Sequence, residues 1–481
     1  MPTDPRPVRS VPMTLKQSSR LQESNGLRSA FGNIRDFVDR VANSSPARLA
    51  LIVYAAVILV FAGLLSLPLA AADGQVTPLH DAVFTAVSAV CVTGLTVVST
   101  AAHWTLFGQA VILLGIFIGG LDTLTLASML ALMVSKRLGV RGKLIAQQAM
   151  SNAGRLGEVG TLLRIVITTS VLIEVALALM LIPRFIILGE SFAQAVWHGI
   201  FYSISAFNNA GFTPHSDGLV PYEEDLWILV PLMLGVFLGS LGFPVVMVLL
   251  ERGWRFSKWN LHTKLTVQVS LILLVAGTVG WGALEWTNTD TIGGLTDGDK
   301  LIHAVFASVM MRSGGFNLVD QNAMEQTSML LTDALMFAGG GSASTAGGIK
   351  VTTIAIVFLA IAAEARGNRD VTVHGRTVPE GAMRVAISVI VMGATFVALA
   401  AGTLLAVSGE SLDRVLFEVI SAFATVGLST NLSGELPPEG KYVLCILMFA
   451  GRVGTITLAS ALALRERRQL YHFPEERPII G

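Results

Sequence analysis

Charged residues are scarce in this chain. Only 14% of its 481 residues are Asp, Glu, Lys or Arg, whereas hydrophobic residues make up 53%. A soluble globular domain usually carries about 25% charged residues. The composition therefore excludes an ordinary soluble domain and indicates a protein that exposes apolar surface to lipid.

Cysteine is also scarce, with Cys91 and Cys445 as its two occurrences. Both lie in or beside apolar segments, and two such residues offer neither a disulfide framework nor the spacing of a metal site. We interpret them as small apolar filler, because free cysteine is readily buried.

Motifs of enzyme chemistry are missing as well. No Ser/His/Asp arrangement, HExxH pattern or phosphate-binding loop stands at the ends of the apolar segments. The polar tails are also too short for a catalytic domain. We therefore expect no enzyme activity, no organic cofactor and no nucleic-acid partner.

The chain contains many long apolar stretches. A bilayer core about 30 Å thick needs roughly 20 apolar residues per helix. The clearest candidates for spans are Leu49–Ala70, Gly108–Val134, Ile165–Ile182, Leu226–Leu250, Leu265–Leu284, Val385–Val407 and Tyr442–Leu464. These stretches predict a polytopic membrane protein embedded in a lipid bilayer.

The basic residues are concentrated in five segments, whereas several segments between them are acidic. Of the 33 Lys and Arg residues, 26 lie in Met1–Arg48, Lys136–Arg164, Arg252–Lys264, Arg366–Arg384 and Arg465–Arg477. The positive-inside rule places these segments in the cytoplasm, so both termini are cytoplasmic and the number of spans is even. A cleaved signal peptide is the alternative for the N-terminus, but 48 mostly polar residues precede the first apolar stretch.

Four segments share one pattern, which indicates an internal repeat. They read "AVFTAVSAVCVTGLT" from Ala82, "GIFYSISAFNNAGFT" from Gly199, "AVFASVMMRSGGFN" from Ala304 and "VLFEVISAFATVGLS" from Val415. Each has a Phe, an apolar half-helix, a Gly, then Leu or Phe and a hydroxyl or amide residue. The glycines are Gly94, Gly211, Gly315 and Gly427.

Each copy lies between two apolar stretches, so the unit is a span, a short helix, a glycine loop and a second span. Such a short helix cannot cross a bilayer at about 1.5 Å per residue and must re-enter from the acidic side. The prediction is an all-α polytopic membrane protein with four repeats, eight spans and four re-entrant loops around a pseudo-fourfold pore. The boundaries predicted are a tail at residues 1–47, repeats at 48–138, 139–255, 256–365 and 366–465, and a tail at 466–481.

Non-helical backbone survives at membrane depth only where it lines a water-filled path or is packed in protein. Glycine can turn its carbonyl toward a central axis, and four such loops would make rings of oxygens that replace a cation's hydration shell. The half-helices would also aim their negative C-terminal ends at that point. The alternative is four tight turns that merely end helices.

Two later features lie inside apolar spans. The segment Gly339–Lys350 holds five glycines among small residues, and each Gly in a helix costs about 1 kcal/mol relative to Ala. We interpret it as a flexible loop that blocks the pore, with a close helix contact through small residues as the alternative. Arg452 lies in the last span, either beneath the glycine loops as a positive barrier or as a paired structural arginine.

Several single residues leave alternatives open. Asp122 could pair with Arg452 or Lys350, hold a coupling ion, or stay protonated, and Lys350 could instead reach the cytoplasmic interface. Arg312 is expected to brace the third loop through backbone carbonyls, and Glu174 to bond a neighbouring helix. Asn208 and Asn209 are expected to bond the adjacent loops. Histidines recur before each of three pore-helix Phe residues, as interfacial residues or as a metal site; they are His80, His198 and His303.

At this point the sequence resembles the Trk/Ktr/HKT superfamily of potassium transporters, from about Arg48 onward. Beside the four glycine loops, "GGGSASTAGGIKVTT" from Gly339 is similar to that family's intramembrane gate loop. "MFAGRVGTITLAS" from Met448 is similar to its last span with a mid-helix arginine. No extra pair of N-terminal spans precedes Leu49, and the ending "FPEERPIIG" resembles the tail of the B-type membrane protein of Ktr systems. Asp122 departs from the family, which carries a small uncharged residue near that position.

The resemblance implies a selectivity filter that holds K+ at main-chain carbonyls only, and four filter glycines imply potassium selectivity. Its expected residues are Val92, Thr93, Gly94, Asn209, Ala210, Gly211, Ser313, Gly314, Gly315, Thr425, Val426 and Gly427. The expected gate residues are Gly339, Gly340, Gly341, Ser342, Thr345, Gly347, Gly348, Lys350 and Arg452. The resemblance also implies a homodimer above a cytosolic ring of nucleotide-binding, RCK-type regulatory subunits.

The function expected is potassium uptake across the plasma membrane, either passive or as a symporter with Na+ as the coupling ion. A sodium-permeable or sodium-coupled cation transporter of the same fold is the alternative. A membrane-embedded enzyme or sensor is a third hypothesis, which the missing motifs disfavour.

Overall fold

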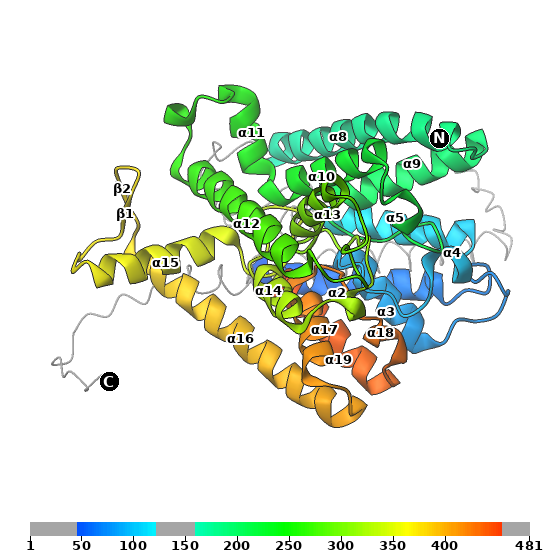
Figure 1. Cartoon of the computed structure of the whole chain (residues 1–481). Helices are drawn as coiled ribbons and strands as arrows, with labels where there is room; N and C mark the ends of the chain where they lie inside the picture. The colour runs from blue at the N-terminus through cyan, green and yellow to red at the C-terminus, as the bar shows by residue number, and fades with distance from the viewer. Residues whose placement is uncertain (1–45, 122–158, 455–481) are drawn as a thin grey trace, which may run out of the picture.

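The structure, a computed structural model, describes residues 46–121 and 159–454 and is mostly helical (Figure 1). Its elements are α2 (Pro46–Leu65), α3 (Leu79–Val90), α4 (Thr100–His103), α5 (Leu106–Gly120), α8 (Val159–Ile187), α9 (Phe192–Phe207), η1 (Val220–Tyr222), α10 (Leu226–Leu241), α11 (Phe243–Arg252), η2 (Phe256–Lys258), α12 (Leu261–Glu285), α13 (Asp297–Met310), η3 (Gln321–Ala323), α14 (Gln326–Phe337), α15 (Val351–Ala365), β1 (Thr372–Val373), β2 (Arg376–Thr377), α16 (Glu380–Ser408), α17 (Leu412–Ala424), α18 (Leu432–Glu435), α19 (Pro438–Phe449) and the π-helical turn η4 (Ala450–Gly454).

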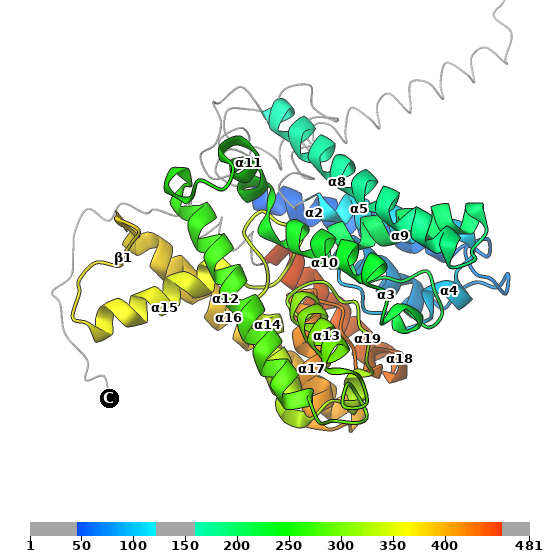
Figure 2. The same cartoon turned by 45° about the horizontal axis from the view of Figure 1, so that its top comes forward.

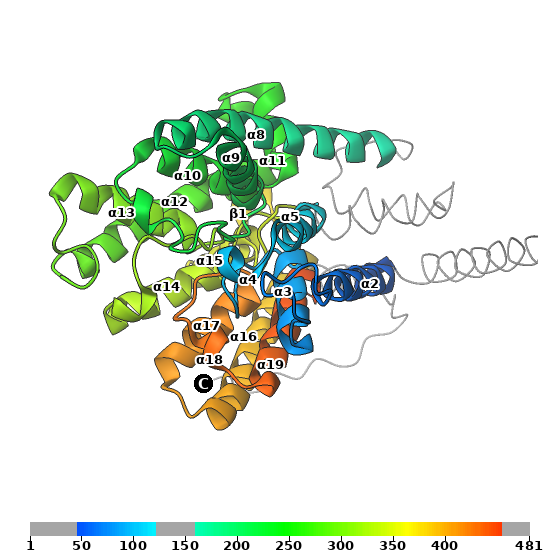
Figure 3. The ribbon, with the colours of Figure 1, turned by 90° about the vertical axis from the view of Figure 1, so that its right-hand side faces the viewer.

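Four groups of helices surround a common centre. Figure 3 shows α2, α3 and α5 on one side, followed around the centre by α8 to α10, then α12 to α14, then α16 to α19. Each group contains, between its outer helices, a short helix that follows a Pro, Ser or Thr residue. Ser191 and Gln194 form a capping box at the start of α9, and Thr296 caps α13.

The short helices α3, α9, α13 and α17 have 12, 16, 14 and 13 residues. At about 1.5 Å per residue, each is too short to cross a bilayer core of about 30 Å. Most of their residues are buried, so the outer helices of each group screen them from the surroundings. We refer to these four as the pore helices.

Three helices among the described residues are long and apolar enough to span a bilayer alone, at 164–187, 261–285 and 380–408. The stretch Leu226–Leu250, predicted as one span, is instead two helices, α10 and α11, bent by 101°. Gly242 adopts φ 92° at the bend, and the next residue, Phe243, donates its N–H to the Ala343 carbonyl at 3.1 Å. The bend therefore depends on a distant segment, which the local sequence does not reveal.

The remaining predicted spans agree with the structure in part. The glycine-rich segment does interrupt its span, because α14 ends at Phe337 and α15 begins at Val351. The C-terminal ends of Gly108–Val134 and Tyr442–Leu464, residues 1–45 of the first tail, the second tail and Asp122 lie outside the described residues, whereas the last two residues of the predicted first tail already belong to α2. A two-stranded hairpin departs from the all-α prediction: β1 and β2 pair antiparallel, with Thr372 opposite Thr377. Figures 1 and 2 show α15 and the hairpin at the periphery, away from the pore helices.

Candidate functional site

The four predicted glycines form a closed ring at the ends of the pore helices. A Cβ atom placed on Gly94 would lie 3.4 Å from Gly211 Cα and would collide with the carbonyl oxygen of Ala210. One placed on Gly211 would lie 2.9 Å from Gly315 Cα. A Cβ placed on Gly315 would lie 3.3 Å from Gly427 Cα, and one placed on Gly427 would lie 3.1 Å from Gly94 Cα. Each glycine is thus next to the glycine of the following repeat, and the fourth returns to the first.

Backbone conformation gives a second reason for glycine at these positions. Gly94, Gly211, Gly315 and Gly427 have φ values of 92°, 70°, 71° and 94°. These angles are easily adopted only without a Cβ atom. Any substitution would therefore meet both an unfavourable backbone angle and the main chain of the neighbouring loop.

The loop of the first repeat turns its carbonyls away from its own pore helix. Thr93 donates its N–H to the Ser88 carbonyl at 2.8 Å, and Gly94 donates its N–H to Ser88 Oγ at 3.1 Å. In a trans peptide the N–H and the C=O of the preceding residue point in opposite directions. The carbonyls of Val92 and Thr93 are therefore directed away from α3, toward the neighbouring loops.

The other repeats use the same arrangement. Val426 and Gly427 donate to the carbonyl and Oγ of Ser421 at 2.9 and 3.1 Å, which directs the carbonyls of Thr425 and Val426 away from α17. In the other two repeats, Ala210 N bonds Ser205 O at 2.8 Å and Gly314 N bonds Met310 O at 2.7 Å, and this turns the carbonyls of Asn209 and Ser313 in the same sense.

The serines were not singled out from the sequence, although a signal was present. Ser88, Ser205 and Ser421 each stand six residues before a ring glycine, inside the quoted repeat. The third repeat is one residue shorter between its Phe and its Gly, and there the Met310 carbonyl accepts the loop N–H groups instead. The Oγ atoms of Ser88 and Ser421 therefore help to orient the loop carbonyls, whereas Ser205 Oγ donates to the Phe212 carbonyl at 2.9 Å.

The loops also hold non-glycine residues at positive φ. Val92, Asn209 and Thr425, each two positions before a ring glycine, have φ values of 55°, 61° and 50°. Left-handed backbone is uncommon for residues other than Gly and strained for β-branched ones such as Val and Thr. Strain of this kind persists where surrounding contacts fix the loop, and it concentrates at functional sites.

A cavity of about 400 Å³ lies against the ring. All four ring glycines line it, together with polar residues that follow them in sequence, Thr96, Thr213, Asn317 and Ser429. The ring thus forms the floor of one polar cavity, which fits a hydrated small ion or polar solute.

The segment 339–350 lies on the other side of the ring, because it contacts residues that precede the glycines. Thr345 Oγ1 donates to Asn209 Oδ1 at 2.8 Å. A Cβ on Gly347 would collide with Thr425 Oγ1. The segment is anchored to the end of α10 by Gly341 N–H, which bonds the Ser240 carbonyl at 2.7 Å.

Arg452 connects this segment to the first repeat. Its Nη1 donates to the Thr345 carbonyl, and its Nη2 donates to the Gly119 carbonyl at 2.6 Å. The residue is 3% exposed and lies in the π-helical turn η4, a distortion common at functional sites. Lys350 is also buried, and its Nζ donates to the Ala346 carbonyl at 2.6 Å.

Glycines in the second spans allow close contact with the backbone of three of the pore helices. A Cβ on Gly119, Gly239 or Gly451 would collide with the carbonyl of Val90, Phe207 or Phe423, respectively. Each of these carbonyls belongs to the residue four positions before a ring glycine. In the third repeat the corresponding glycines, Gly339 to Gly341, belong to the non-helical segment and make no such contact.

Of the other polar residues singled out from the sequence, Glu174 lies as predicted, whereas Asn209 and Arg312 do not. Glu174 bonds a neighbouring helix as predicted, accepting from Asn208 Nδ2 at 2.8 Å, and Asn209 bonds the 339–350 segment rather than an adjacent loop. The prediction for Arg312 is wrong. Its guanidinium lies 5.6 Å from the Phe237 ring centroid, and Nε and Nη1 have no hydrogen-bond partner among the described residues.

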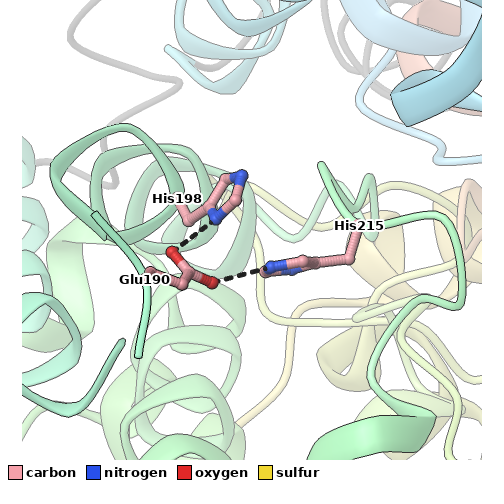
Figure 4. A group of neighbouring side chains, drawn as sticks. All are labelled: Glu190, His198 and His215. Carbon is pink, nitrogen blue, oxygen red and sulfur yellow. Dashed lines mark hydrogen bonds and ion pairs between the residues drawn. The ribbon is translucent and has the colours of Figure 1, made fainter. Parts of the chain in front are cut away.

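A cluster of titratable side chains lies beside the cavity, at the second repeat (Figure 4). Glu190 Oε2 lies 2.8 Å from His198 Nδ1, and Glu190 Oε1 lies 3.0 Å from His215 Nε2. Burial, and then the neighbouring His198, lowers the pKa of His215. The sequence pointed to His80, His198 and His303 together, whereas the structure combines His198 with Glu190 and His215. Cys91 and Cys445 are buried and free.

The apolar helices, the short buried helices and the glycine ring beside a polar cavity are together typical of a membrane transport protein. The chain belongs to the TrkH family of cation transport proteins, whose family model matches residues 29–469.

Relatives and a solved structure agree with that family. The chain is 36% identical to the Ktr system potassium uptake protein B of Vibrio alginolyticus over 92% of this chain and 96% of that protein. It is 32% identical to the potassium/sodium uptake protein NtpJ of Enterococcus hirae over 88% and 95% of the two chains. The crystal structure of the potassium transporter TrkH from Vibrio parahaemolyticus has the same fold, with a TM-score of 0.65 at 18% identity over 86% and 84% of the two chains.

Proposed function

We propose that this protein carries K+ across the plasma membrane through the glycine ring. The observation that carries the proposal is the orientation of the loops: their N–H groups bond the pore helices, so main-chain carbonyls face the neighbouring loops. Carbonyl oxygens arranged in rings replace the hydration shell of a cation. The C-terminal ends of the four pore helices add a partial negative charge at the same place.

The polar cavity is the outer entrance and the 339–350 segment faces the cytoplasm. This orientation is supported by the basic segments, which lie at the ends of the repeats, remote in sequence from the cavity-lining residues. The positive-inside rule then places both termini in the cytoplasm. Ions reach the ring through the cavity, lose water there and leave past the loop.

The gate is the 339–350 segment together with Arg452. The segment is hydrogen-bonded to α10 through Gly341 and to a filter loop through the Thr345 hydroxyl. Arg452 donates a further hydrogen bond to the Thr345 carbonyl. A positive charge directly beneath the ring repels the transported cation, so passage requires this contact to open.

Ion flux in liposomes tests the proposal. Purified protein in potassium-loaded vesicles should take up 86Rb+ when an outward potassium gradient provides the driving force, and a host that lacks potassium uptake should grow on low potassium when it makes this chain. Empty vesicles and an empty vector are the controls. The absence of uptake by correctly folded protein in both systems would contradict the proposal.

Sodium transport is the second candidate, because a relative at 32% identity is named as a potassium/sodium uptake protein. The same vesicles distinguish the two. Competition by external K+ but not by Na+ supports potassium selectivity, whereas equal competition, or uptake that requires Na+, supports the sodium-permeable or sodium-coupled alternative.

The proposed function includes an assembly with further subunits. We infer a homodimer and a separate cytosolic ring of nucleotide-binding, RCK-type subunits, and the name of the relative in Vibrio alginolyticus, a B protein of a Ktr system, supports a further subunit. Mass measurement of the purified protein in detergent should give a dimer, and flux should change when the regulatory subunit is added with its nucleotide.

A further inference from the structure

The cluster at the second repeat joins three segments that are separate in sequence. Glu190 lies between α8 and α9, His198 is on the pore helix α9, and His215 follows the ring glycine Gly211 by four positions. One ligand atom from each residue lies within 4.8 Å of the others. Side-chain exposures of 16% to 19% leave all three reachable, and His215 itself lines the cavity.

Both ring nitrogens of His215 have hydrogen-bond partners. Tyr202 Oη lies 2.9 Å from Nδ1, whereas Glu190 Oε1 and Tyr222 Oη lie 3.0 and 3.1 Å from Nε2. When the proton is on Nδ1, the Tyr202 hydroxyl accepts it and the lone pair of Nε2 is available to a metal ion. A hydrogen-bonded partner on the far nitrogen is the usual support of a histidine that binds a metal.

The carboxylate of Glu190 lies between the two imidazoles. His215 Nε2 is 3.0 Å from Glu190 Oε1, and His198 Nδ1 is 2.8 Å from Glu190 Oε2. Without a metal ion, hydrogen bonds satisfy these contacts. A bound cation would take the place of the shared protons and use the same atoms as ligands.

We propose that Glu190, His198 and His215 bind a divalent transition-metal ion, of which Zn2+ is the best match, at the mouth of the cavity. Two imidazoles and one carboxylate are a donor set typical of zinc, with a fourth position open to water. Bond lengths of about 2.0–2.2 Å require the ligand atoms to separate by a few tenths of an ångström from their present hydrogen-bond distances. Rotation of these partly exposed side chains provides that change.

A bound ion would connect the loop before α9, the pore helix and the loop after the ring. Binding to the folded protein alone would stabilise it, because only the fold brings the three residues together. The site does not depend on which ion the ring transports, so its test does not rely on flux.

Binding of Zn2+ to the purified full-length protein tests the site. Calorimetry should show one zinc per protomer, and zinc should raise Tm. In the variant that combines His198→Gln and His215→Gln, affinity should fall by at least about tenfold and the Tm rise should disappear. His80→Gln is the matched control, since His80 lies near the start of pore helix α3 beside Asp81 at 3.5 Å and should leave zinc binding intact.

A second variant distinguishes the loss of a metal ligand from misfolding of the protein. His198→Cys replaces one zinc ligand by another, so it should retain binding that His198→Gln loses. Equal zinc affinity in the wild type and the double glutamine variant, or no binding by folded wild-type protein at micromolar zinc, would overturn the proposal. Loss of binding in both His198→Gln and His198→Cys, with unchanged elution and Tm in the absence of zinc, would also count against it.

Discussion

The guanidinium of Arg452 donates a hydrogen bond to the Thr345 carbonyl across 107 positions of sequence. The same side chain reaches Gly119 in the first repeat, so one buried cation holds the third and first repeats together beneath the ring. In the proposed function, this charge acts both as a lock on the 339–350 segment and as an electrostatic barrier to the transported cation.

Replacing Arg452 by Ala should therefore speed ion flux several-fold, because barrier and lock disappear together. Rubidium uptake into vesicles measures the change. Arg384→Ala is the matched control, since Arg384 pairs with Glu380 at an exposed helix position. Unchanged flux in folded Arg452→Ala protein would mean that this arginine is structural.

Gly94→Ser should weaken the preference for K+ over Na+. The new Cβ would collide with the Ala210 carbonyl and would hold a residue at φ 92°, so the first loop must shift away from the ring. Competition of Na+ with rubidium uptake reports the change. Gly402→Ser, at an exposed helix position with nothing within 4 Å of a Cβ, should leave selectivity unchanged.

Ser421→Ala should disturb the ring without adding bulk. It removes the Oγ atom that accepts the Gly427 N–H at 3.1 Å and leaves a buried donor unpaired. A hydrogen bond of this kind contributes about 1 kcal/mol, so ion preference should change by about fivefold. The control is Ser388→Ala, whose hydroxyl bonds only its own helix at an exposed site. If the two variants have identical selectivity, the serine does not orient the loop.

The buried ion pair between Lys441 and Asp81, at 2.8 Å, joins the fourth repeat to the first. Asp81→Asn should lower stability by about 3–5 kcal/mol, because it leaves the lysine charge buried without its partner. Thermal melting followed by size-exclusion chromatography measures the loss. Combining Asp81→Leu with Lys441→Met should recover much of it, whereas an additive loss would show that the pair is not coupled.

External Zn2+ should slow rubidium uptake, which relies on both the proposed site and the proposed transport. The ion adds positive charge at the mouth of the cavity and reduces the local concentration of cations. Zinc sensitivity should be lost in the double variant His198→Gln, His215→Gln and kept in His80→Gln. Zinc binding without any effect on flux would leave the site in place but remove this electrostatic role.

The sequence was most informative where a pattern repeated. Gly94, Gly211, Gly315 and Gly427 could be aligned because each follows the same half-helix, and the structure places them in one ring. Gly339–Lys350 was predicted as a loop because five glycines oppose helix formation, and the segment is non-helical.

Tertiary contacts determine the features that the local sequence did not predict. The bend at Gly242 depends on the Ala343 carbonyl, about a hundred positions away, and the pairing of Glu190 with His215 depends on how α8 packs on α9. Arg312 was assigned to its own loop because it lies beside it in sequence, yet it packs on Phe237 of another repeat. Local periodicity carries no information on such distant partners.

The contacts between second-span glycines and pore helices differ among the repeats. In the first, second and fourth repeats a glycine of the second span touches the backbone of the pore helix, whereas in the third repeat the corresponding glycines lie in a non-helical segment. That segment instead contacts Asn209 and Thr425 of the second and fourth repeats. On the proposed gating, a movement of the third repeat alone would therefore reach two neighbouring filter loops at once.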